Sequence, residues 1–119
     1  NQMEILEDFN TTILYLDQKD LDACGFQKGD TEGFVNYGLS LENMELSAFI
    51  LPRDGGHKLS FRSKTSFDVN QFARSYFEGG GHKNAAGGKS DRSMEDTIAY
   101  LKDCLKSHQE ELKSYASIV

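Results

Sequence analysis

The chain has 119 residues and a mass of 13.3 kDa, which is the size of one domain. Hydrophobic residues make up 38% and charged residues 27%, a balance that argues against disorder. The net charge of −6 is uneven, because residues 1–52 carry −8, residues 53–92 carry +4 and residues 93–119 carry −2. This acidic balance argues against a broad grip on duplex DNA, and the local basic segment favours a small ligand that carries phosphate.

Several features of the sequence concern its setting. The longest apolar runs are too short to span a bilayer, and the first residues lack the pattern of a signal peptide. Because the chain does not begin with Met, we interpret residues 1–119 as a single domain cut from a longer protein. Cys24 and Cys104 match neither a CxxC motif nor a zinc spacing, so we expect reduced thiols in a cytoplasmic protein.

Apolar alternation and turn signals predict mainly strands in the first half of the chain. The first expected element is a hairpin of strands 3–8 and 11–17 around Phe9-Asn10. A helix over 18–24 follows, which Gly25 ends, and then a loop over 26–32 and a helical turn over 33–38. A strand over 44–51 ends at Pro52 and is followed by a turn over 53–56.

The second half predicts one further strand and two amphipathic helices. In the strand over 57–64, Leu59 and Phe61 alternate with Ser60 and Arg62, so Arg62 points away from the buried face. Asp68 and Gln71 form a capping box, and Gly79 ends that helix. The last helix begins at Ser93, with Asp96 supporting the cap. Their apolar stripes, which we assign to the core, are Val69, Phe72, Ala73, Tyr76 and Phe77, and then Met94, Ile98, Leu101, Leu105 and Leu112.

The order of these elements determines the expected fold class. Strand pairs alternate with helices, and neither repeats nor low-complexity tracts interrupt them. We therefore expect an α/β (α+β) fold with a mixed sheet of about five strands covered by helices.

The glycine run over residues 79–88 is the most informative feature. It reads Gly79-Gly80-Gly81-His82-Lys83-Asn84-Ala85-Ala86-Gly87-Gly88, with five glycines and two alanines in ten residues. Three glycines in a row exceed what a helix cap needs, since each glycine costs chain entropy on folding. We expect a loop whose amides form an anion-binding nest, with His82 and Lys83 adding donors at its mouth. The alternative is a flexible turn with an exposed histidine.

Arg62-Ser63 is the second candidate for phosphate contact. A guanidinium group can bind phosphate through two parallel hydrogen bonds, and serine adds a hydroxyl; the alternative is an arginine in a surface ion pair. His57 in a turn and His108 on a solvated helix face are interpreted as incidental. We find neither a catalytic constellation nor a metal-ligand spacing, so no metal is expected within these 119 residues.

These motifs together resemble a known family. Residues 58–64, Asp68-Val69 opening a helix, and the GGGH…AAGG run resemble the DHH-associated C-terminal domain of the DHH phosphoesterases. The similarity is greatest to the RecJ-like group of oligoribonucleases (nanoRNases) and phosphoadenosine-phosphate phosphatases. The segment Thr31 to Asn36 also fits, and the order of elements fits over nearly the whole chain.

The resemblance implies a role for this domain in a longer enzyme. The full-length protein would be a phosphoesterase with exonuclease activity, and an N-terminal DHH domain would bind two manganese ions and supply all catalytic residues. This C-terminal domain would bind short RNA or a phosphorylated nucleotide across a cleft, through Gly79, Gly80, Gly81, His82, Lys83 and Asn84, with Arg62 and Ser63 on the adjacent phosphate. No catalytic residue and no metal would belong to this fragment, and a homodimer is left open.

Two other functions stay open from the sequence. One is a non-catalytic RNA-binding module, like the glycine-rich domain associated with alanyl-tRNA synthetase, although the acidic balance argues against extended RNA binding. The other is an interaction domain without a ligand.

Overall fold

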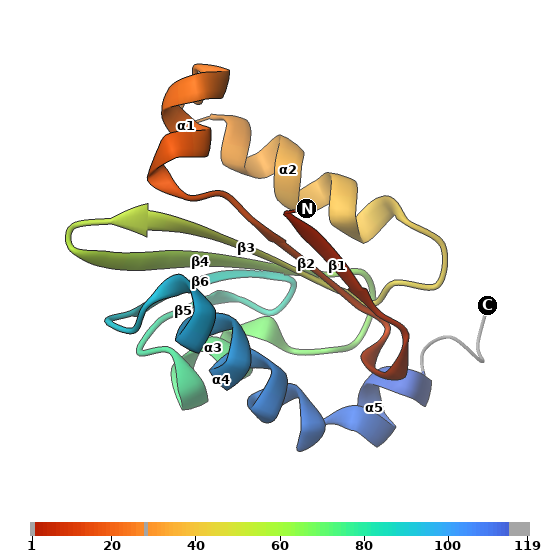
Figure 1. Cartoon of the computed structure of the whole chain (residues 1–119). Coiled ribbons are helices and arrows are strands. Elements are labelled where there is room, and N and C mark those ends of the chain that lie inside the picture. Colours follow the sequence, from red (N-terminus) through yellow and green to blue (C-terminus); the bar gives the residue numbers. More distant parts are fainter. Residues whose placement is uncertain (1, 28, 115–119) are drawn as a thin grey trace.

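A mixed sheet of six strands organises the molecule, in the order β1-β2-β3-β4-β6-β5 (Figure 1). The computed structural model describes residues 2–27 and 29–114. Its strands are β1 (Met3–Leu6), β2 (Thr11–Tyr15), β3 (Leu46–Arg53), β4 (Gly56–Ser63), β5 (Gly80–His82) and β6 (Ala85–Ser90). The helices are α1 (Gln18–Cys24), α2 (Asp30–Ser40), α3 (Val69–Tyr76), α4 (Met94–Lys106) and α5 (Gln109–Ser114), with a short 3-10 turn η1 (Glu7–Phe9). The expected fold class is confirmed, with six strands where we expected about five.

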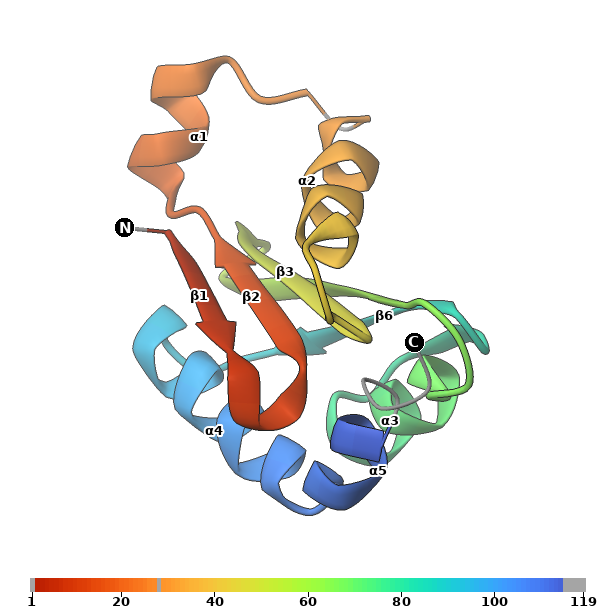
Figure 2. The same cartoon turned by 90° about the vertical axis from the view of Figure 1, so that its right-hand side faces the viewer.

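The sheet is mixed because one neighbouring pair of strands is parallel. β2 and β3 run in parallel, and the other neighbouring pairs are antiparallel. The parallel pair requires a crossover, which α1 and α2 provide. Figure 2 shows α1 and α2 on one side of the sheet and α3, α4 and α5 on the other. The two faces of the sheet are therefore covered by different sets of helices.

Each face of the sheet carries its own apolar cluster. The larger cluster joins β2, β3, β4 and β6 to α3, α4 and α5. In it the Phe61 ring makes an edge contact with Phe72 and a tilted contact with Phe77, at centroid distances of 5.6 and 5.5 Å. The smaller cluster lies under α2, where Phe49 of β3 stacks on Phe34 at 5.3 Å. Both predicted helical stripes supply the larger cluster, as expected.

Helix α2 is longer than the helical turn expected over 33–38. The sequence prediction treated the two glycines as boundaries, whereas Gly33 and Gly38 both lie inside the helix. A Cβ at Gly38 would lie 2.6 Å from both Leu14 Cδ1 and Ser47 Oγ. Gly38 therefore permits the helix to approach the sheet closely, and it does not end the helix.

Other element boundaries also differ from the sequence prediction. β3 continues through Pro52, which pairs with His57 on the neighbouring strand. The first strand ends at Leu6, and the last helix, which the sequence predicted as one, is divided into α4 and α5. The predicted caps at Gly25, Asp68 and Ser93 are present, and Asp17, which the sequence prediction placed in a strand, caps the start of α1. Among the described residues, no helix is both long and apolar enough to cross a membrane.

Candidate functional site

The glycine run forms a β-hairpin, and the expectation of a loop is wrong. β5 and β6 pair antiparallel, with Gly80 opposite Gly87, Gly81 opposite Ala86 and His82 opposite Ala85. β6 also pairs with β4, so the hairpin forms one end of the sheet. The expectation that Gly79 ends the preceding helix is wrong, because α3 ends at Tyr76 with Phe77 as its cap and Glu78 takes the left-handed conformation (φ 50°).

Close packing explains several of the hairpin glycines. A Cβ at Gly79 would lie 1.9 Å from Gly87 O, one at Gly81 would lie 2.7 Å from Ala85 O, and one at Gly88 would lie 2.6 Å from Phe77 Cβ. Each position therefore excludes a side chain, because the chain itself occupies the space.

Two amides of the run are already hydrogen-bonded within the chain. The Gly79 N–H donates to Ala73 O at 3.2 Å, and the Gly81 N–H donates to Asn70 Oδ1 at 2.9 Å. The interpretation of the run as a nest of free amides is therefore wrong for these two residues. The assignment of Gly79, Gly80 and Gly81 to ligand contact stays a prediction.

The tip of the hairpin presents His82 and Lys83 to solvent, and both side chains are exposed. Asn84 holds this tip in place, since its Nδ2 donates to Ser63 Oγ at 2.9 Å and to Thr65 O at 2.8 Å. The buried Ser63 hydroxyl in turn donates to Phe67 O at 2.6 Å. Ser63 and Asn84 thus fix the position of the exposed donors, and a direct contact of either residue with ligand stays a prediction.

A buried carboxylate supports the loop beneath this tip. Glu45 is 3% exposed and accepts hydrogen bonds from Thr65 Oγ1 (2.8 Å), Thr65 N (3.1 Å) and Phe67 N (3.2 Å). The loop after β4 is therefore organised around one charge. Sequence analysis missed Glu45, because nothing in its local pattern separates a buried carboxylate from an exposed one.

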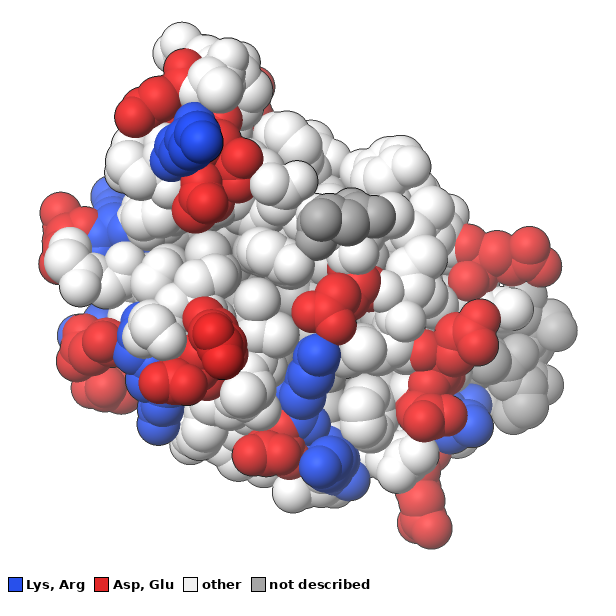
Figure 3. Space-filling model, in the orientation of Figure 1, with Lys and Arg blue, Asp and Glu red and all other residues white. Residues whose placement is uncertain are grey.

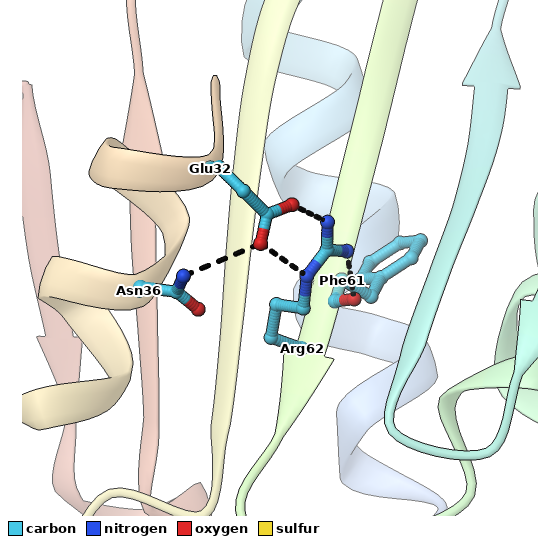
Figure 4. A network of polar contacts seen from close by, with 4 residues as sticks. All are labelled: Glu32, Asn36, Phe61 and Arg62. Carbon is cyan, nitrogen blue, oxygen red and sulfur yellow. Dashed lines mark hydrogen bonds and ion pairs between the residues drawn. The ribbon is translucent and has the colours of Figure 1, made fainter. Parts of the chain in front are cut away.

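Arg62 forms an ion pair with Glu32 of α2 (Figure 4). Its Nη2 and Nε donate to the two carboxylate oxygens of Glu32, and Nη1 donates to Phe61 O at 2.8 Å. The Arg62 hydrogen bond lowers the pKa of Glu32 below its usual value. A guanidinium group has five N–H donors. Three are used here, so two remain for a ligand, one on each terminal nitrogen.

Strand register brings Arg62 and His82 onto one face. Arg62 pairs with Ala85, and Ala85 pairs with His82, so the three residues form one row across β4, β6 and β5. Residues in one row point to the same side of a sheet. That side is the α2 side, since Arg62 contacts Glu32 there. Within this row, Ala85 places a methyl group between the two donors.

The surface charge is mixed on the face of the molecule that Figure 3 shows. In the view of Figure 3, acidic and basic side chains alternate over the surface without forming a broad basic patch. This distribution agrees with the net charge of −6 and disfavours extended binding along nucleic acid.

The sequence analysis placed His108 on a solvated helix face, and this prediction is wrong. The chain turns between α4 and α5, and this turn places the His108 ring against Phe67, Phe72 and Tyr76. Tyr76 OH lies 3.1 Å from His108 Nε2. His108 is thus a packing residue. Within residues 2–27 and 29–114, no group of three or more His, Cys, Asp or Glu could hold a metal ion.

The fold and the site together define a class of α+β domain with a glycine-rich terminal hairpin next to an arginine-bearing strand. A family model described as the DHHA1 domain matches residues 10–107, and the chain belongs to this family. No curated protein matches the chain. The resemblance seen in the sequence is confirmed.

Solved structures share this fold. An exopolyphosphatase-related protein from Bacteroides fragilis is 34% identical with a TM-score of 0.88, and the match covers 93% of this chain and 33% of that chain. A pGpG-specific phosphodiesterase from Vibrio cholerae is 15% identical (TM-score 0.59, covering 88% and 34%). The C-Ala domain of alanyl-tRNA synthetase from Aquifex aeolicus is 11% identical (TM-score 0.57, covering 95% and 99%). The last two show the fold alone, and the chain spans about a third of the Bacteroides protein.

Proposed function

We propose that this chain is the substrate-binding domain of a DHH-family phosphoesterase, which hydrolyses short oligoribonucleotides, phosphoadenosine phosphate or related nucleotides. The observation that carries the proposal is the row of Arg62 and His82 on one face of the sheet, in a chain of the DHHA1 family. Both side chains supply donors suited to phosphate oxygen.

The geometry of Arg62 supports a single phosphate held at a defined place. Glu32 occupies one edge of the guanidinium group and fixes its plane, while the two remaining N–H donors face away from the carboxylate. The exposed His82 imidazole and the Lys83 ammonium add donors from the hairpin tip. An imidazole donates more strongly when it is protonated, and a bound phosphate favours that form.

The catalytic part of the enzyme would lie elsewhere in a longer protein. The described residues do not fit a two-manganese site, so both metal ions and the catalytic residues would come from an N-terminal DHH domain. That domain and a short RNA or phosphorylated nucleotide are the proposed partners, and a cytoplasmic setting fits the two free cysteines. A second copy of the chain is left open.

The test measures turnover and metal binding separately in the full-length protein. His82→Ala and Arg62→Ala are each expected to lower turnover of a short RNA at least tenfold, while manganese binding by calorimetry is unchanged. Lys106→Ala on the far helix α4 is the control and should behave as wild type. Wild-type kinetics in both site variants would reject the proposal.

A non-catalytic RNA-binding module is the second candidate, because the match to the C-Ala domain covers 99% of that separate domain. Salt dependence distinguishes the two candidates. A single phosphate contact changes log K by less than about one per tenfold change in salt, whereas a run of phosphates gives a several-fold steeper slope. A steep slope with long RNA would favour the second candidate.

A further inference from the structure

The turn at the tip of the β5–β6 hairpin is not of the kind that hairpins favour. His82 pairs with Ala85, so Lys83 and Asn84 form a two-residue turn between them. The two-residue turns that match the twist of paired strands have a positive φ at one or both central residues. Neither Lys83 nor Asn84 has a positive φ. The turn therefore depends on contacts with another segment for its position.

These contacts come from the β4–α3 segment, residues 63–69, which runs from the end of β4 into α3. The Ser63 N–H donates to Asn84 O at 3.1 Å, and the Val69 N–H donates to Lys83 O at 2.8 Å. Both residues of the turn are thus held through their backbone by one segment, in addition to the side-chain contacts of Asn84. A shift of the β4–α3 segment would move the turn and the donors that it carries.

Glu45 attaches this segment to the sheet. Its carboxylate accepts from both Thr65 donors and from the Phe67 N–H, and its backbone oxygen accepts from the Lys64 N–H at 2.9 Å. The Glu45 N–H donates to Asn10 O at 2.8 Å, immediately before β2. One residue therefore connects the middle of the β4–α3 segment to the starts of β2 and β3.

A buried carboxylate is energetically unfavourable at such a position unless it has a specific role. Glu45 is 3% exposed, and none of the ion pairs within residues 2–27 and 29–114 includes it. Removing a charge from water without a cationic partner costs free energy, and a well-packed apolar side chain is often the more stable alternative. An apolar side chain, however, cannot fix three donors of a loop at defined positions. The carboxylate is therefore better suited to holding geometry than to maximising stability.

We propose that Glu45 is a positioning residue of the candidate phosphate site. Through the β4–α3 segment it holds the hairpin turn where His82 and Lys83 reach the phosphate on Arg62. The inference rests on the proposed function, because these two side chains are the donors whose position matters. Glu45 lies beneath the loop and makes no contact with the ligand. Its removal should therefore reduce only what the two tip donors contribute, and a protein without those donors should be insensitive to the change.

The experiment is a double-mutant cycle on the full-length protein, with kcat/KM measured for a short RNA well below the melting temperature of every variant. We expect Glu45→Ala to lower kcat/KM about fivefold in the wild-type background. In a variant that already carries His82→Ala and Lys83→Ala, the same change should lower kcat/KM less than about twofold. Glu45→Gln should retain more than about half of the wild-type value, because its amide oxygen still accepts from the loop.

Leu101→Ala on α4 is the control for lost stability. Leu101 is buried in the larger cluster, and its truncation lowers the melting temperature by an amount comparable to that expected for Glu45→Ala. At the assay temperature this control should change kcat/KM less than about twofold in either background. If Glu45→Ala does not fold, Glu45→Asp takes its place with the same expected pattern, since a carboxylate one methylene shorter displaces the loop and keeps its charge.

The outcomes separate the positioning role from the proposed function. Equal losses from Glu45→Ala in both backgrounds, or wild-type kinetics in Glu45→Ala, would overturn the positioning role, while a loss in His82→Ala would leave the proposed function standing. A loss in Leu101→Ala as large as that in Glu45→Ala would overturn the positioning role too, because activity would then follow stability alone. Wild-type kinetics in both His82→Ala and Arg62→Ala would overturn both proposals.

Discussion

Replacing Glu45 by alanine tests whether one buried charge organises the loop beneath the site. Its carboxylate accepts three hydrogen bonds, two from Thr65 and one from the buried Phe67 amide. A hydrogen bond to a charged group contributes about 1.5–3 kcal/mol when its partner is buried. Thr65 is exposed and can turn to water, so its two bonds count for less. We therefore expect Glu45→Ala to destabilise the chain by about 3 kcal/mol.

Glu45→Gln provides a graded comparison. The amide oxygen can replace the carboxylate oxygen that accepts from Thr65 N and Phe67 N, and the Thr65 hydroxyl can rotate to accept from the new amide group. What is lost is mainly the charge, so we expect a cost of about 1 kcal/mol. Glu42→Ala, at an exposed carboxylate nearby, should cost less than about 0.5 kcal/mol.

The assay is urea unfolding at pH 7, followed by circular dichroism and repeated by thermal scan. A loss of about 3 kcal/mol in a domain of this size corresponds to a fall in melting temperature of about 15 °C. Chemical shifts of Asn84 and Ser63 should also change, because the loop holds their contacts. If Glu45→Ala costs no more than Glu42→Ala, the assignment of this carboxylate is refuted.

Three further outcomes are expected. Because Arg62 lowers the pKa of Glu32, the ion pair should stabilise the chain at pH values above the usual carboxyl pKa, and this stabilisation should be lost as the pH falls through the lowered pKa. Glu32→Gln should remove this pH dependence from urea unfolding curves measured between pH 7 and pH 3. Burial raises the pKa of the Cys104 thiol, so iodoacetamide should label only Cys24 in the native chain and both thiols in denaturant, and rapid native labelling of both would contradict this. Asp68→Ala removes the α3 cap and should cost about 1 kcal/mol in thermal unfolding, a value near zero being evidence against the cap.

The sequence correctly predicted the elements whose hydrophobic pattern and caps lie within one segment. The stripe from Val69 to Phe77 repeats at helical spacing, and its burial follows directly. The predictions at Pro52 and Gly38 were wrong because the roles of these two residues depend on other segments of the chain. Proline is tolerated in β3 at its pairing position with His57, and Gly38 serves the contact of α2 with β2 and β3. Both depend on neighbours that are distant in sequence.

The candidate site also has features that the sequence indicated and features that only the structure shows. The glycine run and the strand that carries Arg62 were sufficient to indicate the family, whereas the phosphate ligand that they predict stays a prediction. The sequence could not indicate that the glycine run is a hairpin, nor that Glu32 would occupy one edge of Arg62. Thirty positions separate Glu32 from Arg62, and only the crossover through α2 brings them together.

Composition and periodicity by themselves determined helix α1, helix α3, the start of α4, the apolar stripes of α3 and α4 and the chemistry of the donors, because these properties reside in single segments. The tertiary structure alone decided the strand register that aligns Arg62 with His82 and sets Lys58 against Lys89. Register depends on hydrogen bonds between strands, and a shift of one residue would move each of these side chains to the other face of the sheet.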